Sequence, residues 1–165
     1  ELSNSGLIHF RYNRKLNTRL RIEAFSQYQY NKILGIESRN LIGIGPRYKI
    51  NKSDKMVFYI GSLLMQEFEK ASDNTKTMSY QRLSSYLSIS IKNKAKTLEF
   101  TSVVYYQPNI NLWKDYRLSN QTTLAFNISS KLQFVNSINY GFDSYAPTNI
   151  SKQNIILSNG FKLNL

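Results

Sequence analysis

Arginine is the residue whose type and spacing point most clearly to chemistry in this sequence. Seven of the eight arginines fall on the polar phase of a two-residue alternation, which would place them on one face of β-strands. These are Arg11, Arg19, Arg21, Arg39, Arg47, Arg82 and Arg117. The eighth, Arg14, falls in a predicted turn, as most lysines do. A planar guanidinium pairs with carboxylates and other oxyanions, so the arginine-rich face is a candidate anion-binding surface.

Whether such a face binds anions depends on how many acidic residues share it and neutralise the arginines. Candidate partners on the same phase are few, namely Glu23, Glu99 and Glu67. Unpaired arginines would favour the passage of anions, as rings of arginine do in pores. Arginines neutralised by carboxylates and carbonyl oxygens would instead form a packed network that fills the interior. The sequence leaves both alternatives open, and we favour the packed network.

The composition excludes several kinds of catalytic site. The chain has no Cys and one His, so neither a thiolate site nor a zinc site with several histidines can be built. His9 shares its phase with Arg11, but a nucleophilic triad needs a serine and an acid that converge on the histidine. The glycines at 43 and 45 lack the Lys-Ser/Thr of a phosphate-binding loop. We therefore expect no enzyme, no cofactor and no metal.

A period-two pattern of apolar and polar residues runs through almost the whole chain of 165 residues. In the segment 82–91, for example, leucine and isoleucine alternate with serine and tyrosine. The pattern predicts nine strands, at about 6–14, 19–31, 38–50, 56–69, 79–92, 96–107, 114–129, 131–143 and 151–165. The segment 56–69 is apolar on both faces around Gly61, which predicts a bulge or a locally filled interior. The predicted fold class is all-β and antiparallel.

The predicted connections alternate in length. Short turns at 15–18, 51–55, 93–95 and 129–130 alternate with longer links at 32–37, 70–78, 108–113 and 144–150. This pattern is typical of an up-and-down transmembrane β-barrel with short periplasmic turns, and it predicts a periplasmic C-terminus. The first and last strands both run toward the short turns, whereas bacterial barrels have an even number of strands. We therefore expect residues 1–165 to be the C-terminal portion of one barrel domain whose N-terminal strands precede Glu1.

Aromatic residues collect near the ends of the predicted strands. Trp and Tyr concentrate at membrane–water interfaces, although aromatic residues also favour strands in general. We expect an interfacial girdle formed by Tyr28, Tyr30, Tyr48, Tyr106, Trp113, Tyr116, Tyr140 and Phe142. Loop lysines such as Lys32 and Lys70 would either meet lipopolysaccharide phosphates on the outer leaflet or form an ordinary solvated surface.

Several short motifs resemble those of a known family. They are D-Y-R-L at 115–118 after Pro108, Y-x-x-D-S-x-x-P at 140–147, the final strand at 158–165, and G-x-G-x-x-Y at 43–48. In these motifs the chain resembles a bacterial domain family of unknown function whose members are described as salt-induced outer membrane proteins. The resemblance implies a barrel of about twelve strands in the outer membrane of a Gram-negative bacterium, with three strands before this chain.

The sequence thus predicts a non-enzymatic outer-membrane β-barrel that is structural, channel-like or a subunit of a larger outer-membrane complex. Its expected partners are outer-membrane lipid, lipopolysaccharide and other outer-membrane proteins. The alternative is a soluble basic β-sheet protein that binds nucleic acid or another anionic ligand on a tyrosine-rich sheet. Because the basic residues are spread along the strands and no stacking motif is present, nucleic acid is not expected. A soluble ligand-binding barrel would need an apolar interior, whereas the polar phase carries Arg, Gln, Asn and Ser.

Overall fold

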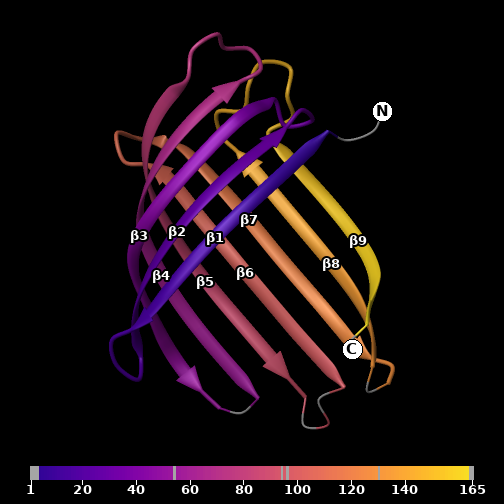
Figure 1. Ribbon diagram of the computed structural model, residues 1–165. Helices are drawn as coiled ribbons and strands as arrows, with labels where there is room; N and C mark the ends of the chain where they lie inside the picture. The colour runs from indigo at the N-terminus through magenta and orange to yellow at the C-terminus, as the bar shows by residue number, and fades with distance from the viewer. Residues whose placement is uncertain (1–3, 54, 94, 96, 130, 164–165) are drawn as a thin grey trace.

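The computed structural model describes residues 4–53, 55–93, 95, 97–129 and 131–163, and these residues form one antiparallel sheet of nine strands. The strands are β1 (Ser5–Lys15), β2 (Leu20–Asn31), β3 (Ile36–Lys52), β4 (Met56–Ala71), β5 (Met78–Lys92), β6 (Leu98–Asn109), β7 (Leu112–Asn127), β8 (Leu132–Asp143) and β9 (Gln153–Leu163). Each strand pairs with the next along the chain, and the sheet curls into a half-barrel (Figure 1). The prediction of nine antiparallel strands is confirmed.

The described residues contain no helix. Accordingly, a helical segment with the length and apolarity needed to traverse a membrane is absent from them.

Two of the predicted longer links are short in the structure. The predicted link at 108–113 is a turn of only Ile110 and Asn111, because the Asn109 side chain accepts a hydrogen bond from the Asn111 amide at 3.0 Å and closes the turn. The predicted link at 32–37 is closed by Gly35, whose φ of +65° suits glycine. Longer connections remain at 72–77 and 144–152, so the predicted alternation of lengths holds only in part.

The two faces of the sheet differ sharply in polarity. In β4, Leu63 is 1% exposed, whereas its neighbour Leu64 is 62% exposed. The buried phase also carries charged side chains that meet across several strands, which is possible only on the concave side of a curled sheet. The convex face is mainly apolar and exposed, with Phe10 at 72% and Leu157 at 67%. Buried Leu63 and Met65 confirm the locally filled interior predicted for 56–69.

Glycine permits two close approaches on the concave face. Gly61 lies directly opposite Tyr86, and a Cβ at Gly61 would collide with the Tyr86 ring. A Cβ at Gly45 would collide with the backbone of Ser62 and Leu63. Gly61 therefore lets the Tyr86 ring lie flat against the sheet, and Gly45 lets the backbones of β3 and β4 approach closely. Glycine kinks support curvature in designed sheets in the same way.

Substituting Gly61 tests this role. Gly61→Ala is expected to lower the free energy of unfolding by about 1–3 kcal/mol, because the Tyr86 ring must move away from the sheet. Gly160→Ala is the matched control, since nothing lies within 4 Å of a Cβ built there. Denaturant titration followed by circular dichroism measures both variants. Equal stability of the two variants would contradict the proposed packing.

Candidate functional site

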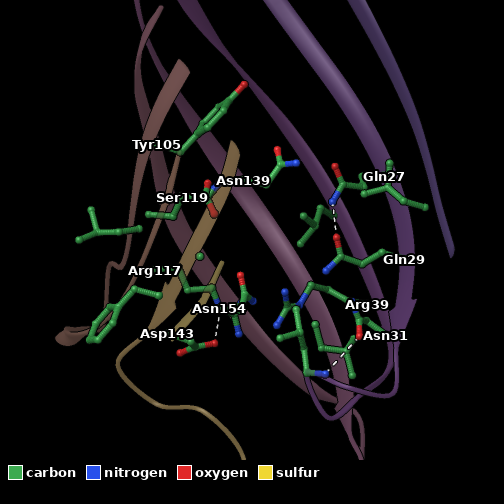
Figure 2. Close-up of a pocket in the computed structure, with 18 of the residues that line it drawn as sticks. Gln27, Gln29, Asn31, Arg39, Tyr105, Arg117, Ser119, Asn139, Asp143 and Asn154 are labelled. Atoms are coloured by element: carbon green, nitrogen blue, oxygen red, sulfur yellow. Dashed lines mark hydrogen bonds and ion pairs between the residues drawn. The ribbon is translucent and has the colours of Figure 1, made fainter. Parts of the chain in front are cut away.

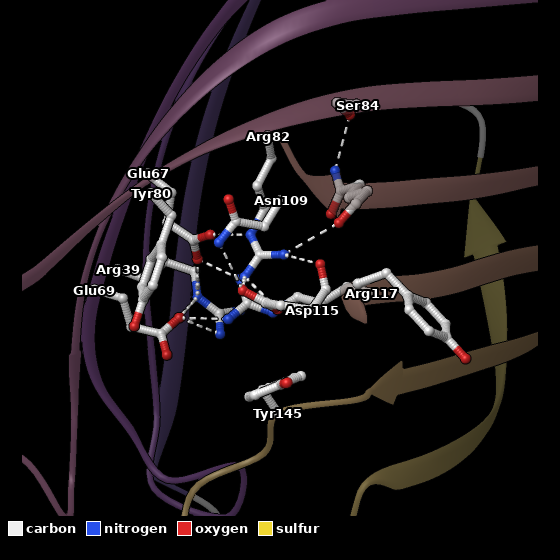
Figure 3. A network of polar contacts seen from close by, with 12 residues as sticks. Arg39, Glu67, Glu69, Tyr80, Arg82, Ser84, Asn109, Asp115, Arg117 and Tyr145 are labelled. Atoms are coloured by element: carbon white, nitrogen blue, oxygen red, sulfur yellow. Dashed lines mark hydrogen bonds and ion pairs between the residues drawn. The ribbon is translucent and has the colours of Figure 1, made fainter. Parts of the chain in front are cut away.

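The charged side chains on the concave face gather mainly in a network near one end of the sheet. We define the loop end as the end that carries the connections β2–β3, β4–β5, β6–β7 and β8–β9, and the turn end as the opposite one. The loop-end network consists of Arg39, Glu67, Glu69, Arg82, Asp115, Arg117 and Asp143. Figure 3 labels all of these residues except Asp143. Its members come from β3, β4, β5, β7 and β8, so the network ties five strands together.

Glu67 lies at the centre of this network with a fully buried side chain. Its carboxylate contacts Arg82 Nε at 2.5 Å and Arg39 Nε at 3.1 Å, and it also pairs with Arg117. Three guanidinium groups therefore surround one carboxylate that has no access to water. A buried carboxylate remains charged only when such partners offset its loss of hydration.

The other three carboxylates of the network pair with the remaining N–H groups of the same arginines. Arg82 donates two hydrogen bonds to Asp115, at 2.9 and 3.0 Å. Arg117 contacts Asp143 at 2.7 Å and Glu69 at 2.9 Å, and Arg39 contacts Glu69 at 2.5 Å. The network thus holds three positive and four negative groups, a net charge of −1.

A second group of cations lies toward the turn end. Glu23, 1% exposed, contacts Arg47 at 3.3 Å and Arg11 at 3.7 Å and accepts a hydrogen bond from the Tyr86 hydroxyl at 2.9 Å. Arg11 also reaches across the concave side to the Tyr105 hydroxyl at 3.2 Å. These contacts join β1 to β6 and show how far the sheet curls.

Between the two groups the concave face forms a half-open cavity of about 740 Å³. Amide side chains from both walls point into it, with Gln27, Gln29 and Asn31 on one wall and Asn139 and Asn154 on the other (Figure 2). His9 is held at the cavity by a contact of 2.8 Å between Nδ1 and Gln27. No group of three or more His, Cys, Asp or Glu side chains suited to a metal ion occurs among the described residues.

The loop end of the cavity is covered by the longest connection. This segment, 144–152, reaches back to the β4–β5 link, where the Thr148 amide donates a hydrogen bond to Asp73 at 2.8 Å. Pro147 and Ile150 of the same segment line the cavity. The 144–152 segment therefore bounds the loop end of the cavity, where Arg39, Arg117 and Asp143 of the loop-end network also line it.

Most of the charged residues singled out in the sequence lie on the concave face. The two groups described above contain Arg11, Glu23, Arg39, Arg47, Arg82 and Arg117. The guanidinium carbon of Arg21 lies 6.0 Å from the centroid of the Tyr59 ring. Arg19 differs, because it lies in the exposed β1–β2 turn and donates to the Tyr48 hydroxyl at 3.4 Å. This hydrogen bond raises the pKa of the Arg19 guanidinium above its ordinary value. Glu99 is paired at the rim with Lys92, at 3.1 Å.

The aromatic residues form two rows on the convex face. Toward the loop end, Tyr116 lies between Tyr106 and Phe142, each ring pair 5.7 Å apart. Toward the turn end, Phe134 lies between Phe126 and Phe161, at 6.5 and 5.5 Å. Phe126 and Phe134 of this second row are not among the aromatic residues that the sequence predicts for the interface.

The other predicted interface residues are more dispersed. Tyr28 and Tyr30 lie side by side on β2 with their ring centroids 6.5 Å apart. Tyr48 is exposed near the turn end beside Arg19, and Tyr140 is half-buried on β8. Trp113 is exposed at the start of β7, and it falls on the opposite alternation phase to Tyr116.

The sequence model of one family matches residues 1–161, and that family is described as a protein of unknown function, DUF481. The chain belongs to the DUF481 family. Searches of curated proteins and of solved structures find no match.

The structure gives a physical role to motifs that carried the resemblance to this family. In D-Y-R-L, Asp115 and Arg117 both enter the loop-end network, since residues two apart share a strand face. In the D-S element, Asp143 pairs with Arg117, and Ser144 Oγ accepts a hydrogen bond from the Tyr116 amide at 2.8 Å. These two motifs therefore meet at the junction of β7 and β8.

Sequence reasoning missed most of the acidic half of the network. Glu69, Asp115 and Asp143 were not identified as partners of the arginines, and Glu67 was only one of three candidates. The available signal was the spacing of two residues in Glu67-x-Glu69 and Asp115-x-Arg117, which places both members of each pair on one face. Asp143 gave no such signal, because its partner lies 26 residues away on β7.

Removing the central charge tests the importance of the network. Glu67→Gln is expected to lower the free energy of unfolding by about 3–5 kcal/mol, because it leaves buried guanidinium groups without their shared counterion. The matched control is Glu37→Gln, which breaks an exposed pair with Lys70 and is expected to cost less than about 1 kcal/mol. Denaturant unfolding monitored by circular dichroism compares the variants. A loss for Glu67→Gln no larger than that of the control would contradict the role of the network.

Proposed function

We propose that this chain forms part of a non-enzymatic outer-membrane β-barrel whose interior is obstructed by the loop-end network rather than open as a pore. The observation that carries the proposal is the inverted polarity of the sheet, with charged side chains buried on the concave face and large apolar side chains exposed on the convex face. In water such a convex surface would be unfavourable, because it far exceeds the apolar patch of an ordinary soluble monomer. Facing lipid, the same surface needs no protein cover.

The two aromatic rows support a membrane-spanning orientation. On β7, Tyr116 of the loop-end row and Phe126 of the turn-end row are separated by ten residues, or about 33 Å along an extended strand. A strand tilted by about 40° would place the rows about 25 Å apart along the membrane normal, which matches the apolar band of outer-membrane barrels. In this orientation the loop end is extracellular and the turn end periplasmic.

The edges of the sheet support a larger assembly. Among the described residues, β1 and β9 each pair with one neighbour only and do not pair with each other. Unpaired strand edges are not tolerated in lipid, because their backbone groups lack hydrogen-bond partners. We propose that further strands complete a barrel of about twelve.

The loop-end network favours a structural barrel over an open anion pore. Each of its arginines pairs with at least two carboxylates, so they offer few free donors to a passing anion. The connection at 144–152 adds a cover at the same end. Lipid, lipopolysaccharide and other outer-membrane proteins are the proposed partners, and the role is that of a scaffold or a subunit of a membrane complex.

Lipid contact is tested with tryptophan at two neighbouring positions. In a Trp113→Phe background, Tyr106→Trp places the reporter on the convex face and Tyr105→Trp places it on the concave face. In vesicles containing brominated lipid, fluorescence of the Tyr106→Trp protein is expected to be quenched strongly and that of the Tyr105→Trp protein weakly. Equal quenching, or a monodisperse folded protein in buffer without detergent, would refute the membrane proposal.

Planar-bilayer recording of the complete barrel tests the obstructed interior. We expect no steady conductance, because the loop-end network and the 144–152 connection obstruct the concave side. An anion-selective conductance that decreases in Arg47→Ala and Arg117→Ala, but not in the convex-face control Arg14→Ala, would favour a channel instead.

A further inference from the structure

Three cations surround one tyrosine ring on the concave face near the turn end. The Tyr59 ring centroid lies 3.8 Å from the Arg47 guanidinium carbon, 6.0 Å from that of Arg21 and 5.6 Å from Lys49 Nζ. Strand register brings them together, since Arg21 lies directly opposite Arg47 and Lys49 lies directly opposite Tyr59. Like charges placed directly opposite one another are unfavourable, so this arrangement calls for a counterion.

The described part of the chain supplies too little negative charge here. Arg21 and Lys49 make no side-chain hydrogen bond or ion pair within it, and their recorded contact is with the Tyr59 ring. Glu23 is the carboxylate that pairs with Arg47, and it also pairs with Arg11. Four cations thus share one carboxylate among these residues, a net charge of +3, whereas the loop-end network has a net charge of −1.

A buried donor adds independent evidence for a missing acceptor. Arg47 Nε is buried and has no hydrogen-bond partner among the described residues. A buried N–H without an acceptor is costly, and such groups in folded proteins are normally satisfied by water, an ion or a ligand. This unpaired N–H group belongs to Arg47, the arginine closest to the Tyr59 ring and the centre of the cation group.

We infer that Arg21, Arg47 and Lys49 form a binding site for a phosphate-type oxyanion. A tetrahedral dianion can accept hydrogen bonds from a guanidinium edge and from an ammonium group at once. It also reduces a local charge of +3 far more than a monocarboxylate would. The site requires only the concave face, so it does not depend on membrane insertion.

The phosphate site borders the cavity through two of its neighbours. Arg11 and Glu23, which are linked to Arg47, also line the 740 Å³ cavity. Its volume leaves room beside Arg11 and Glu23 for the organic part of a phosphate monoester. Inorganic phosphate and glycerol phosphate therefore serve as the two probes, and tighter binding of glycerol phosphate would identify a phosphate monoester as the ligand type.

Nuclear magnetic resonance of the full chain, labelled with ¹⁵N at arginine, observes the proposed contact directly. Titration with either probe is expected to shift the Arg47 Nε–Hε signal in a saturable manner, while chloride at equal ionic strength leaves it in place. Arg21→Gln and Lys49→Gln are each expected to weaken binding about tenfold, since each removes one charge-assisted donor. Neither side chain has another polar partner among the described residues, so both variants should keep the fold.

Arg14→Gln provides the matched control, because it removes the same charge at the same end from the convex phase of β1. Probe affinity is expected to be unchanged in this variant. The inference is overturned if neither probe shifts the Arg47 signal. It is equally overturned if Arg14→Gln weakens binding as much as Arg21→Gln, because the affinity would then reflect overall positive charge.

Discussion

The burial of Glu67 is the constraint on which the concave face depends. A carboxylate without access to water is tolerated only when cations offset its lost hydration, and here Arg39, Arg82 and Arg117 do so together. Because these arginines come from β3, β5 and β7, a shift in register of any one of those strands would remove a partner. The network therefore specifies strand register as well as filling the interior, since a slip of one residue moves a side chain to the other face.

Curvature is the second condition for this arrangement. Arg117 on β7 reaches Glu69 on β4, and Arg11 on β1 reaches Tyr105 on β6, only because the sheet is curled. Gly61 contributes by letting the Tyr86 ring lie close to the sheet, where its hydroxyl holds Glu23. The same curl leaves the apolar phase on the outside, so one geometric feature produces both the charged interior and the exposed apolar exterior.

The two ends of the concave face are electrically different. Near the loop end the carboxylates outnumber the arginines, and each guanidinium group pairs with at least two of them. Near the turn end Arg21 and Lys49 face a tyrosine ring instead of a carboxylate. An arginine-rich interior is thus not uniform, because its neutralisation depends on where the few acidic residues lie along the strands.

Period-two alternation was sufficient to predict the nine strands, their antiparallel order and the face on which most arginines lie, because side chains on a strand alternate strictly between two faces. Turn chemistry was harder to predict, as the two-residue turn after Asn109 demonstrates. The partner of each arginine was beyond prediction from the sequence. Glu67 and Arg117 are fifty residues apart, and their contact depends on the register and curvature of four strands together. Alternation determines only which face a side chain occupies, whereas the register and curvature of the sheet decide which side chains on that face meet.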